Sequence, residues 1–357
     1  MHYNDEKLSR IRLENADLAV LEDIKPWTVA KYMEYVEGEG GACVLNIHAA
    51  DPEIYRGLPA EKVERANIAQ RNAMRPYRDY TMNDRIQWSI VAVPSPAWAK
   101  KIFPDLPEEA AQEALWEAIF EVTRMNEPDP VAAWRTHLDA MARHRDFLNE
   151  QRFDAVHLKS ANGTDLVIGL AQDHLWEIAE AHTPEGYVFM PNIPTEEVYT
   201  APHRERVNGT VVGTKPYVYN GDIIDGFTIT FRDGKAVAHT ARVGDDLLES
   251  LLTTDEGACR IGEIALVPYS SPISQKGLLF YSTLFDENAA CHIAFGAGYP
   301  GTVAGGTAMD TAALLEKGVN ESVIHDDVMV GAADMDIDGI RPDGARVPLF
   351  RGGEWVI

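Results

Sequence analysis

The sequence predicts an α/β protein in two parts: an N-terminal α/β domain over residues 1–155 and a β-rich α+β domain over residues 156–357. Two observations predict this division. The first part combines long segments of helical periodicity with two strand-like runs, whereas the second consists mainly of short β-like runs separated by turns. A chain of 357 residues, 45% of them hydrophobic, is long enough for two packed domains.

The N-terminal part is expected to contain two strands and two long helices. The strand-like runs are CVLNIH (43–48) and WSIVAV (88–93). The first helix is expected after Asp105, a candidate N-cap, with Pro107 in its first turn. Its buried face is predicted from helical spacing to consist of Ala111, Leu115, Ile119 and Val122.

A second helix is expected to begin near Pro130, with apolar residues repeating along one face. His137 and His144 share that face but lie seven residues apart. Two helical turns separate them by roughly 10 Å along the axis, which is too far for one metal ion. We therefore predict that both histidines are surface or packing residues.

The β-rich part carries a clear hairpin signal in FRDGKAV, where Asp233-Gly234 is a turn dipeptide between two strand-like runs. The helical periodicity gives way to short β-like runs near residues 150–165, which places the predicted boundary between the parts.

Composition restricts the class of protein. A net charge of −24 weighs against nucleic-acid binding and favours cationic ligands. The apolar runs are too short for a membrane span, and the polar start MHYNDEKLSR does not resemble a secretory signal. Three scattered cysteines do not make a disulfide framework, so a reduced, cytoplasmic location is expected.

Acids and histidines interrupt apolar, strand-like sequence at four places in the second part. Unpaired charge is costly to bury, so their recurrence in such sequence predicts a shared site. The four segments are PTEEVYTAP (194–202), GEIALVP (262–268), FDENAACH (285–292) and NESVIHDDVMVG (320–331).

Strand geometry narrows the candidates in the last segment. Side chains alternate between the faces of a strand, so His325 and Asp327 point the same way and suit one metal centre, whereas Asp326 points away. In PTEEV, Glu196 and Glu197 are adjacent, and only one of them can face the site if the segment is extended.

The other two segments offer three more candidates. Glu263 stands at the head of a buried strand, where a lone glutamate is unusual unless it is paired or ligated. Glu287 and His292 are five residues apart, so the chain must bend between them if both are to reach one site.

Charge is consistent with a pair of divalent cations, because four carboxylates with two neutral imidazoles carry four negative charges. Mixed carboxylate and imidazole donors suit Zn, Co, Mn or related ions, and the absence of cysteine argues against a structural zinc site.

Long motifs make the chain similar to the M29 family of metalloaminopeptidases, which includes aminopeptidase T, aminopeptidase S and PepS-like enzymes. The resemblance runs from about Asp5 to the end of the chain. It is carried by PNIPTEEVYTAP, RVNGTV, DEGACRIGEIALVP, SPIS, TLFDENAACHIAFGAGYP and GVNESVIHDDVMVG.

The resemblance implies a set of site residues. It implies two divalent metal ions (Zn, Co, Mn or Mg) held by Glu197, Glu263, Glu287, His292, His325 and Asp327, with Glu263 expected to bridge them. It implies that Tyr299 is catalytic and lies close to the metals, and we expect Tyr299 to donate a hydrogen bond to the developing oxyanion. Glu196 is the expected general base, because it adjoins a ligand without being one.

The resemblance also implies a homodimer that acts on peptides with a free N-terminus. Relatives usually carry a further N-terminal segment of about one βαβ unit, so the N-terminal domain is expected to be shortened, and Val328 stands where Phe is more common. Two alternatives to the aminopeptidase are an inactive metal- or peptide-binding homologue and a two-metal phosphoesterase. The four segments that carry the expected ligands contain no Arg or Lys for a phosphate group, which counts against the phosphoesterase.

Overall fold

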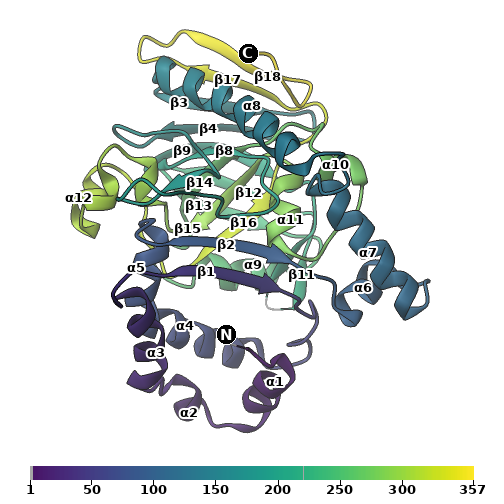
Figure 1. Cartoon of the computed structure of the whole chain (residues 1–357). Helices are drawn as coiled ribbons and strands as arrows, with labels where there is room; N and C mark the ends of the chain where they lie inside the picture. Colours follow the sequence, from purple (N-terminus) through teal and green to yellow (C-terminus); the bar gives the residue numbers. More distant parts are fainter. Residues whose placement is uncertain (1–2, 220) are drawn as a thin grey trace. The chain divides into compact units, whose positions relative to one another are not determined.

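The computed structural model describes residues 3–219 and 221–357 (Figure 1). Its contacts divide the chain into two compact units that interleave along the sequence. The first consists of Met1–Ile119, Ala181–Ile193 and Val218–Asp222, and the second of Phe120–Glu180, Pro194–Tyr217 and Ile223–Ile357. These units are defined by contacts in space and not by a single boundary along the chain. The domain boundary expected between residues 155 and 156 stays a prediction.

The first unit is built on a small parallel sheet of β1 and β2. Their register runs from Cys43 paired with Gln87 to His48 paired with Ala92, which confirms both strands expected from the sequence. Leu13, Leu21 and Val63, from three of its helices, form a buried cluster. The elements that lie wholly within this unit are α1 (Glu6–Asn15), α2 (Leu18–Glu22), α3 (Pro26–Val36), β1 (Cys43–His48), α4 (Ala60–Ala73), α5 (Arg75–Met82), β2 (Gln87–Ala92), α6 (Pro96–Ile102), β6 (Ala181–His182) and β7 (Val188–Phe189).

The two long helices form where their periodicity predicts. Helix α7 (Glu108–Val122) buries all four residues of its predicted apolar face. It begins after Pro107, so Asp105 lies before the helix and the N-cap prediction was wrong. Helix α8 (Pro130–Gln151) has Pro130 in its first turn, and Asp129 caps it by accepting a hydrogen bond from the Ala132 N–H at 3.0 Å.

A large antiparallel sheet dominates the second unit, with strand order β13-β12-β9-β4-β3-β17-β18-β19 (Figure 1). The predicted Asp233-Gly234 turn joins β12 to β13, and both residues have positive φ angles of 49° and 79°, as a tight hairpin requires. The strands are β3 (Ala155–Lys159), β4 (Asp165–Leu170), β9 (Pro202–Val212), β12 (Thr228–Arg232), β13 (Lys235–Thr240), β17 (Asp336–Ile340), β18 (Arg346–Arg351) and β19 (Glu354–Trp355).

A second sheet, of order β16-β15-β14-β8-β5, carries the candidate site. Its central strands are buried along their whole length. The ring of Phe295 stacks on Phe231 of the large sheet, with centroids 6.1 Å apart. One face of β15 therefore packs on the large sheet, and its other face is left for the site. The strands are β5 (Glu177–Ile178), β8 (Val198–Thr200), β14 (Ile261–Leu266), β15 (His292–Gly296) and β16 (His325–Met329).

Short helices complete the second unit, and β10 (Tyr217–Tyr219) with β11 (Asp222–Ile224) forms a small pair. The fold class is confirmed in outline: N-terminal helices with a small parallel sheet, and a β-rich C-terminal region. Across the described part of the chain, no helix is both long enough and apolar enough to cross a membrane. The remaining helices are α9 (Asp245–Leu252), α10 (Pro272–Lys276), α11 (Thr283–Asp286), η1 (Glu287–Ala289), η2 (Pro300–Thr302), η3 (Gly306–Ala308) and α12 (Thr311–Glu316).

Candidate metal centre

The register of the second sheet brings the candidate residues together. Glu263 on β14 pairs with Ala294 on β15, and Ala294 pairs in turn with Asp327 on β16. Two residues further along β15, Gly296 pairs with His325. His292 lies two residues before Ala294, on the same face of β15. Three neighbouring strands therefore present their acids and histidines on a single face.

A bulge in β14 aims Glu263 at this face. The pairing with β15 shifts between Ile261 and Glu263, which leaves Gly262 as the extra residue. A Cβ atom at position 262 would lie 2.4 Å from the carbonyl oxygen of Ala297, so the close approach of these backbones requires glycine.

Glu263 joins two sets of potential metal ligands. Its Oε1 lies 3.6 Å from Nε2 of His292, and its Oε2 lies 3.8 Å from Nε2 of His325. Around His292, Glu197 completes one set, with its Oε2 at 3.0 Å from Nε2. Around His325, Asp327 completes the other, with its Oδ1 at 3.6 Å from Nε2. Ligand atoms within each set all lie within 4.8 Å of one another, a spacing that could accommodate a metal ion.

Backbone carbonyls orient both imidazoles. Nδ1 of His325 lies 2.7 Å from the carbonyl oxygen of Ala297, and Nδ1 of His292 lies 3.2 Å from that of Ala290. A carbonyl can only accept, so each Nδ1 carries a proton, and Nε2 is the ring nitrogen that faces the carboxylates. Donation from Nδ1 to a carbonyl oxygen is the arrangement that metal-ligating histidines commonly adopt.

Glu287 reaches the same region through the bend that the sequence requires. Helix η1 begins at Glu287 and turns the chain before β15, which begins at His292. The side chain is buried, and its pKa is raised well above the ordinary value by that burial and by the charges of Asp327 and Glu197. Glu287 therefore interacts electrostatically with Asp327 and Glu197, although it falls outside the two closest ligand sets.

The electrostatics of the cluster fit a cation. Burial raises the pKa of Glu263 to about 7. Burial disfavours protonation of His292, but its hydrogen bonds to Glu197 and Glu263 outweigh this and raise its pKa well above the ordinary value. Oδ1 of Asp327 is buried and accepts no hydrogen bond among the described residues. A buried carboxylate oxygen without a donor and two oriented imidazoles are a donor set suited to a divalent metal.

Tyr299 lies beside this cluster. Its ring meets that of His325 edge-on, with centroids 4.8 Å apart, and meets Tyr199 with centroids 6.1 Å apart. Burial and the charge of Glu263 raise the pKa of Tyr299 well above its ordinary value, so its hydroxyl stays protonated and can donate a hydrogen bond.

Glu196 is held by a different group of residues. Both of its carboxylate oxygens accept hydrogen bonds from Arg124, at 2.5 and 2.9 Å. His137 lies 3.7 Å from the same carboxylate and 2.8 Å from the carbonyl oxygen of Thr195. His137 is therefore a packing residue, which is one of the two roles expected for it. His144 stacks on Trp355.

Sequence reasoning did not identify Arg124, Asn288 or Tyr199. Arg124 lies 72 residues from its partner Glu196, and Asn288 lies 92 residues from the backbone N–H of Glu196 that it accepts from. Single-sequence patterns do not report such distances. Arg124 follows helix α7 and adopts a positive φ angle of 61°, a feature that only the structure reveals.

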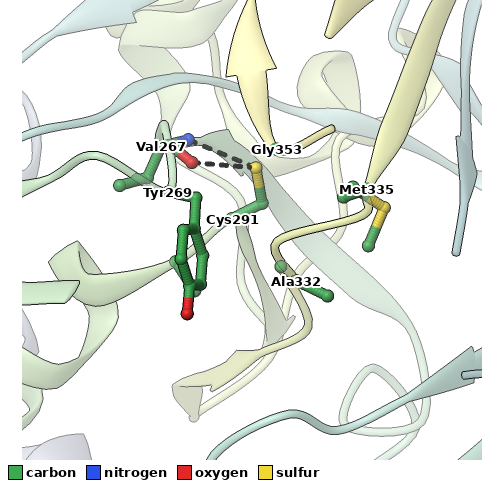
Figure 2. Close-up of a pocket in the computed structure, with 8 residues that line it drawn as sticks. Val267, Tyr269, Cys291, Ala332, Met335 and Gly353 are labelled. Carbon is green, nitrogen blue, oxygen red and sulfur yellow. Dashed lines mark hydrogen bonds between the residues drawn. The ribbon is translucent and has the colours of Figure 1, made fainter. Parts of the chain in front are cut away.

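A small pocket is lined by eight residues, none of which is one of the six candidate ligands (Figure 2). There Sγ of Cys291 lies 3.3 Å from the N–H of Val267 and 3.2 Å from its carbonyl oxygen. Burial raises the pKa of Cys291 to about 11, which keeps the thiol protonated and unsuited to metal ligation. This contact fixes the chain immediately before His292.

The comparison with protein families settles the relationship of the chain. Residues 1–355 match the family described as thermophilic metalloprotease (M29). The chain belongs to the M29 family. The resemblance inferred from the motifs is confirmed.

Relatives of this M29 protein are aminopeptidases. It is 45% identical over 353 residues to aminopeptidase 2 of Geobacillus stearothermophilus, covering 99% of this chain and 85% of the relative. It is 44% identical over 355 residues to aminopeptidase T of Thermus thermophilus, covering 99% and 86%. The solved structure of wild-type AmpT from Thermus thermophilus matches with a TM-score of 0.90 and 43% identity, over 100% of this chain and 86% of that one. This M29 chain is a metalloprotease of the aminopeptidase class.

Proposed function

We propose that this aminopeptidase works with two divalent cations, Zn, Co, Mn or Mg. The proposed ligands are the two oriented histidines and four carboxylates of the cluster: Glu197, Glu263, Glu287, His292, His325 and Asp327. The observation that carries the proposal is the position of Glu263, whose two oxygens face different imidazoles at 3.6 and 3.8 Å. A carboxylate in that position can bridge two cations. Metal ions in such a centre activate water and polarise a carbonyl group.

Tyr299 is proposed to stabilise the oxygen of the scissile peptide bond. Burial and the charge of Glu263 raise the pKa of Tyr299, so its hydroxyl is protonated, and its ring is held against His325. A hydrogen bond that strengthens as the carbonyl oxygen gains charge lowers the barrier by about 3 kcal/mol.

Glu196 is proposed as the general base. It is the neighbour of Glu197 in sequence and is 5% exposed. Arg124 engages both of its oxygens, and each oxygen keeps a second lone pair that can accept a proton. The ion pair with Arg124 also fixes the position of the Glu196 carboxylate while it is ionised.

The substrates are proposed to be peptides with a free N-terminus. An α-ammonium group is cationic, and the site is lined by buried carboxylates in a chain of net charge −24. Acetylation of the amine would remove that charge, so blocked peptides should be poor substrates.

A homodimer and a cytoplasmic location complete the proposal, and both rest on the likeness to the family. Size-exclusion chromatography with light scattering tests the first: a mass near twice 39.5 kDa supports it and a monomer mass refutes it. Cell fractionation tests the second.

The activity itself is tested with metal-depleted protein. Amino-acyl p-nitroanilides and their N-acetylated counterparts are assayed with and without Zn, Co, Mn or Mg. The proposal predicts activity that returns with added metal and is confined to the free amine. Equal hydrolysis by the metal-depleted protein, or equal hydrolysis of the acetylated substrates, would contradict it.

A further inference from the structure

We propose that Asn288 is a positioning residue that joins the two segments carrying Glu197 and Glu287 and thereby sets the affinity of the metal centre. This inference rests on the proposed metal site. It concerns a residue that is not itself a ligand.

Asn288 binds both segments with one amide. Its Oδ1 accepts a hydrogen bond from the backbone N–H of Glu196 at 2.7 Å. Its Nδ2 donates to the carbonyl oxygen of Leu284 at 3.2 Å and, more weakly, to Oε1 of Glu287 at 3.4 Å. The residue is 0% exposed, so the groups that it satisfies lie away from bulk water, and removing the side chain takes these bonds from them.

The backbone of Asn288 is itself fixed. Its carbonyl oxygen accepts a hydrogen bond from Oγ of Ser271 at 2.7 Å, and Ser271 is buried. The asparagine is therefore tied to a third segment and can serve as a fixed point for the other two.

The segment before Glu197 is held from its other side as well. Arg124 binds the carboxylate of Glu196, and His137 lies 2.8 Å from the carbonyl oxygen of Thr195. These contacts fix the side chain of Glu196 and the residue before it. Only Asn288, among the described hydrogen bonds, takes up the N–H of Glu196, which is one peptide unit from Glu197.

The consequence follows from the geometry of ligation. Glu197 lies directly before β8 and Glu287 lies on η1, so both are outside the paired strands, whereas Asp327 and His325 are fixed by strand pairing. Removing the amide frees both segments at once, and groups that orient metal ligands typically alter affinity or activity by about 10–100-fold when lost.

The test compares Asn288→Ala and the smaller polar change Asn288→Ser with a matched control, Asn149→Ala. Asn149 also bridges backbone groups, donating to the carbonyl oxygen of Trp176 at 2.9 Å and accepting from its N–H at 2.8 Å, but it touches no proposed ligand. Cobalt(II) is titrated into each metal-depleted protein by calorimetry, and the visible spectrum of the bound cobalt reports its coordination. Near-ultraviolet circular dichroism checks that each variant is folded.

The expected result is a loss of cobalt affinity of about 10–100-fold and a changed cobalt spectrum in both Asn288 variants, with Asn149→Ala close to the wild type. Affinity and spectrum equal to the wild type in a folded Asn288 variant would overturn the inference, as would equal losses in the control. If both Asn288 variants fail to fold while the control folds, Asn288 is a folding determinant and the positioning role is likewise rejected. Failure of the wild type to bind cobalt would instead reject the proposed metal site.

Discussion

The ring of Tyr299 stands edge-on to the imidazole of His325, with the ring planes 64° apart and the centroids separated by 4.8 Å. Packing fixes the tyrosine beside a proposed metal ligand while its hydroxyl remains available. The ring and the hydroxyl therefore have separable roles.

Tyr299→Phe keeps the ring contact and removes only the hydroxyl. We expect kcat to fall by about 100–1,000-fold with metal content unchanged, because the hydrogen bond is made mainly in the transition state. Steady-state kinetics and metal analysis measure both quantities. Tyr269→Phe is the control, since Tyr269 lines the separate pocket in Figure 2. Unchanged turnover in Tyr299→Phe would remove this residue from the mechanism.

Glu196→Gln preserves shape and removes the proposed base. We expect kcat to fall by about 100–10,000-fold while two cations still bind, because Gln cannot accept the proton. The pH–rate profile provides the check, since the limb that belongs to the base should disappear. Activity near that of the wild type would show that proton transfer depends on another group.

Glu263→Gln tests the bridge. A neutral amide in place of the shared carboxylate should reduce the number of bound cations from two to one or none, as measured by calorimetry and elemental analysis. Glu61→Gln controls for the loss of one negative charge, because the Glu61 side chain is 84% exposed. Two cations bound at wild-type affinity in Glu263→Gln would be incompatible with a bridging role.

Asp84→Asn should stabilise the protein in a pH-dependent way. Burial raises the pKa of Asp84 from 3.8 to about 6. Between these values the unfolded chain releases the proton and the folded chain keeps it, so Asp84 lowers stability as pH rises and its full penalty applies above about pH 6.

The gain from Asp84→Asn should therefore be negligible near pH 4 and on the order of 1 kcal/mol at pH 8, after allowance for the partial exposure of the side chain. Asn also tolerates the positive φ angle of 50° at this position. Urea unfolding at both pH values measures the difference. A gain that is equal at pH 4 and pH 8 would show that Asp84 is not titrating in this range.

Local patterns were sufficient for much of the fold. Apolar spacing predicted the buried face of α7, Pro130 predicted the start of α8, and Asp233-Gly234 predicted the hairpin, because each depends on residues within a few positions. The N-cap of α7 was wrong, since Pro107 lies directly before the helix and Asp105 precedes it by two residues.

Part of the site was also accessible from local patterns. The two-residue period of a strand placed His325 and Asp327 on one face, and both belong to the same ligand set. The choice between Glu196 and Glu197 was not accessible from the residues alone, because it depends on Arg124, far away in sequence. The bulge at Gly262 and the hydrogen bond between Asn288 and the N–H of Glu196 likewise depend on contacts between segments that are distant in sequence.

Anomalous scattering from crystals soaked in cobalt tests the central claim most directly. Data collected on both sides of the cobalt absorption edge should show two peaks, with Glu263 contacting both, His292 and Glu197 beside one, and His325 and Asp327 beside the other. A single peak, or peaks remote from Glu263, would contradict the dinuclear centre proposed for this aminopeptidase.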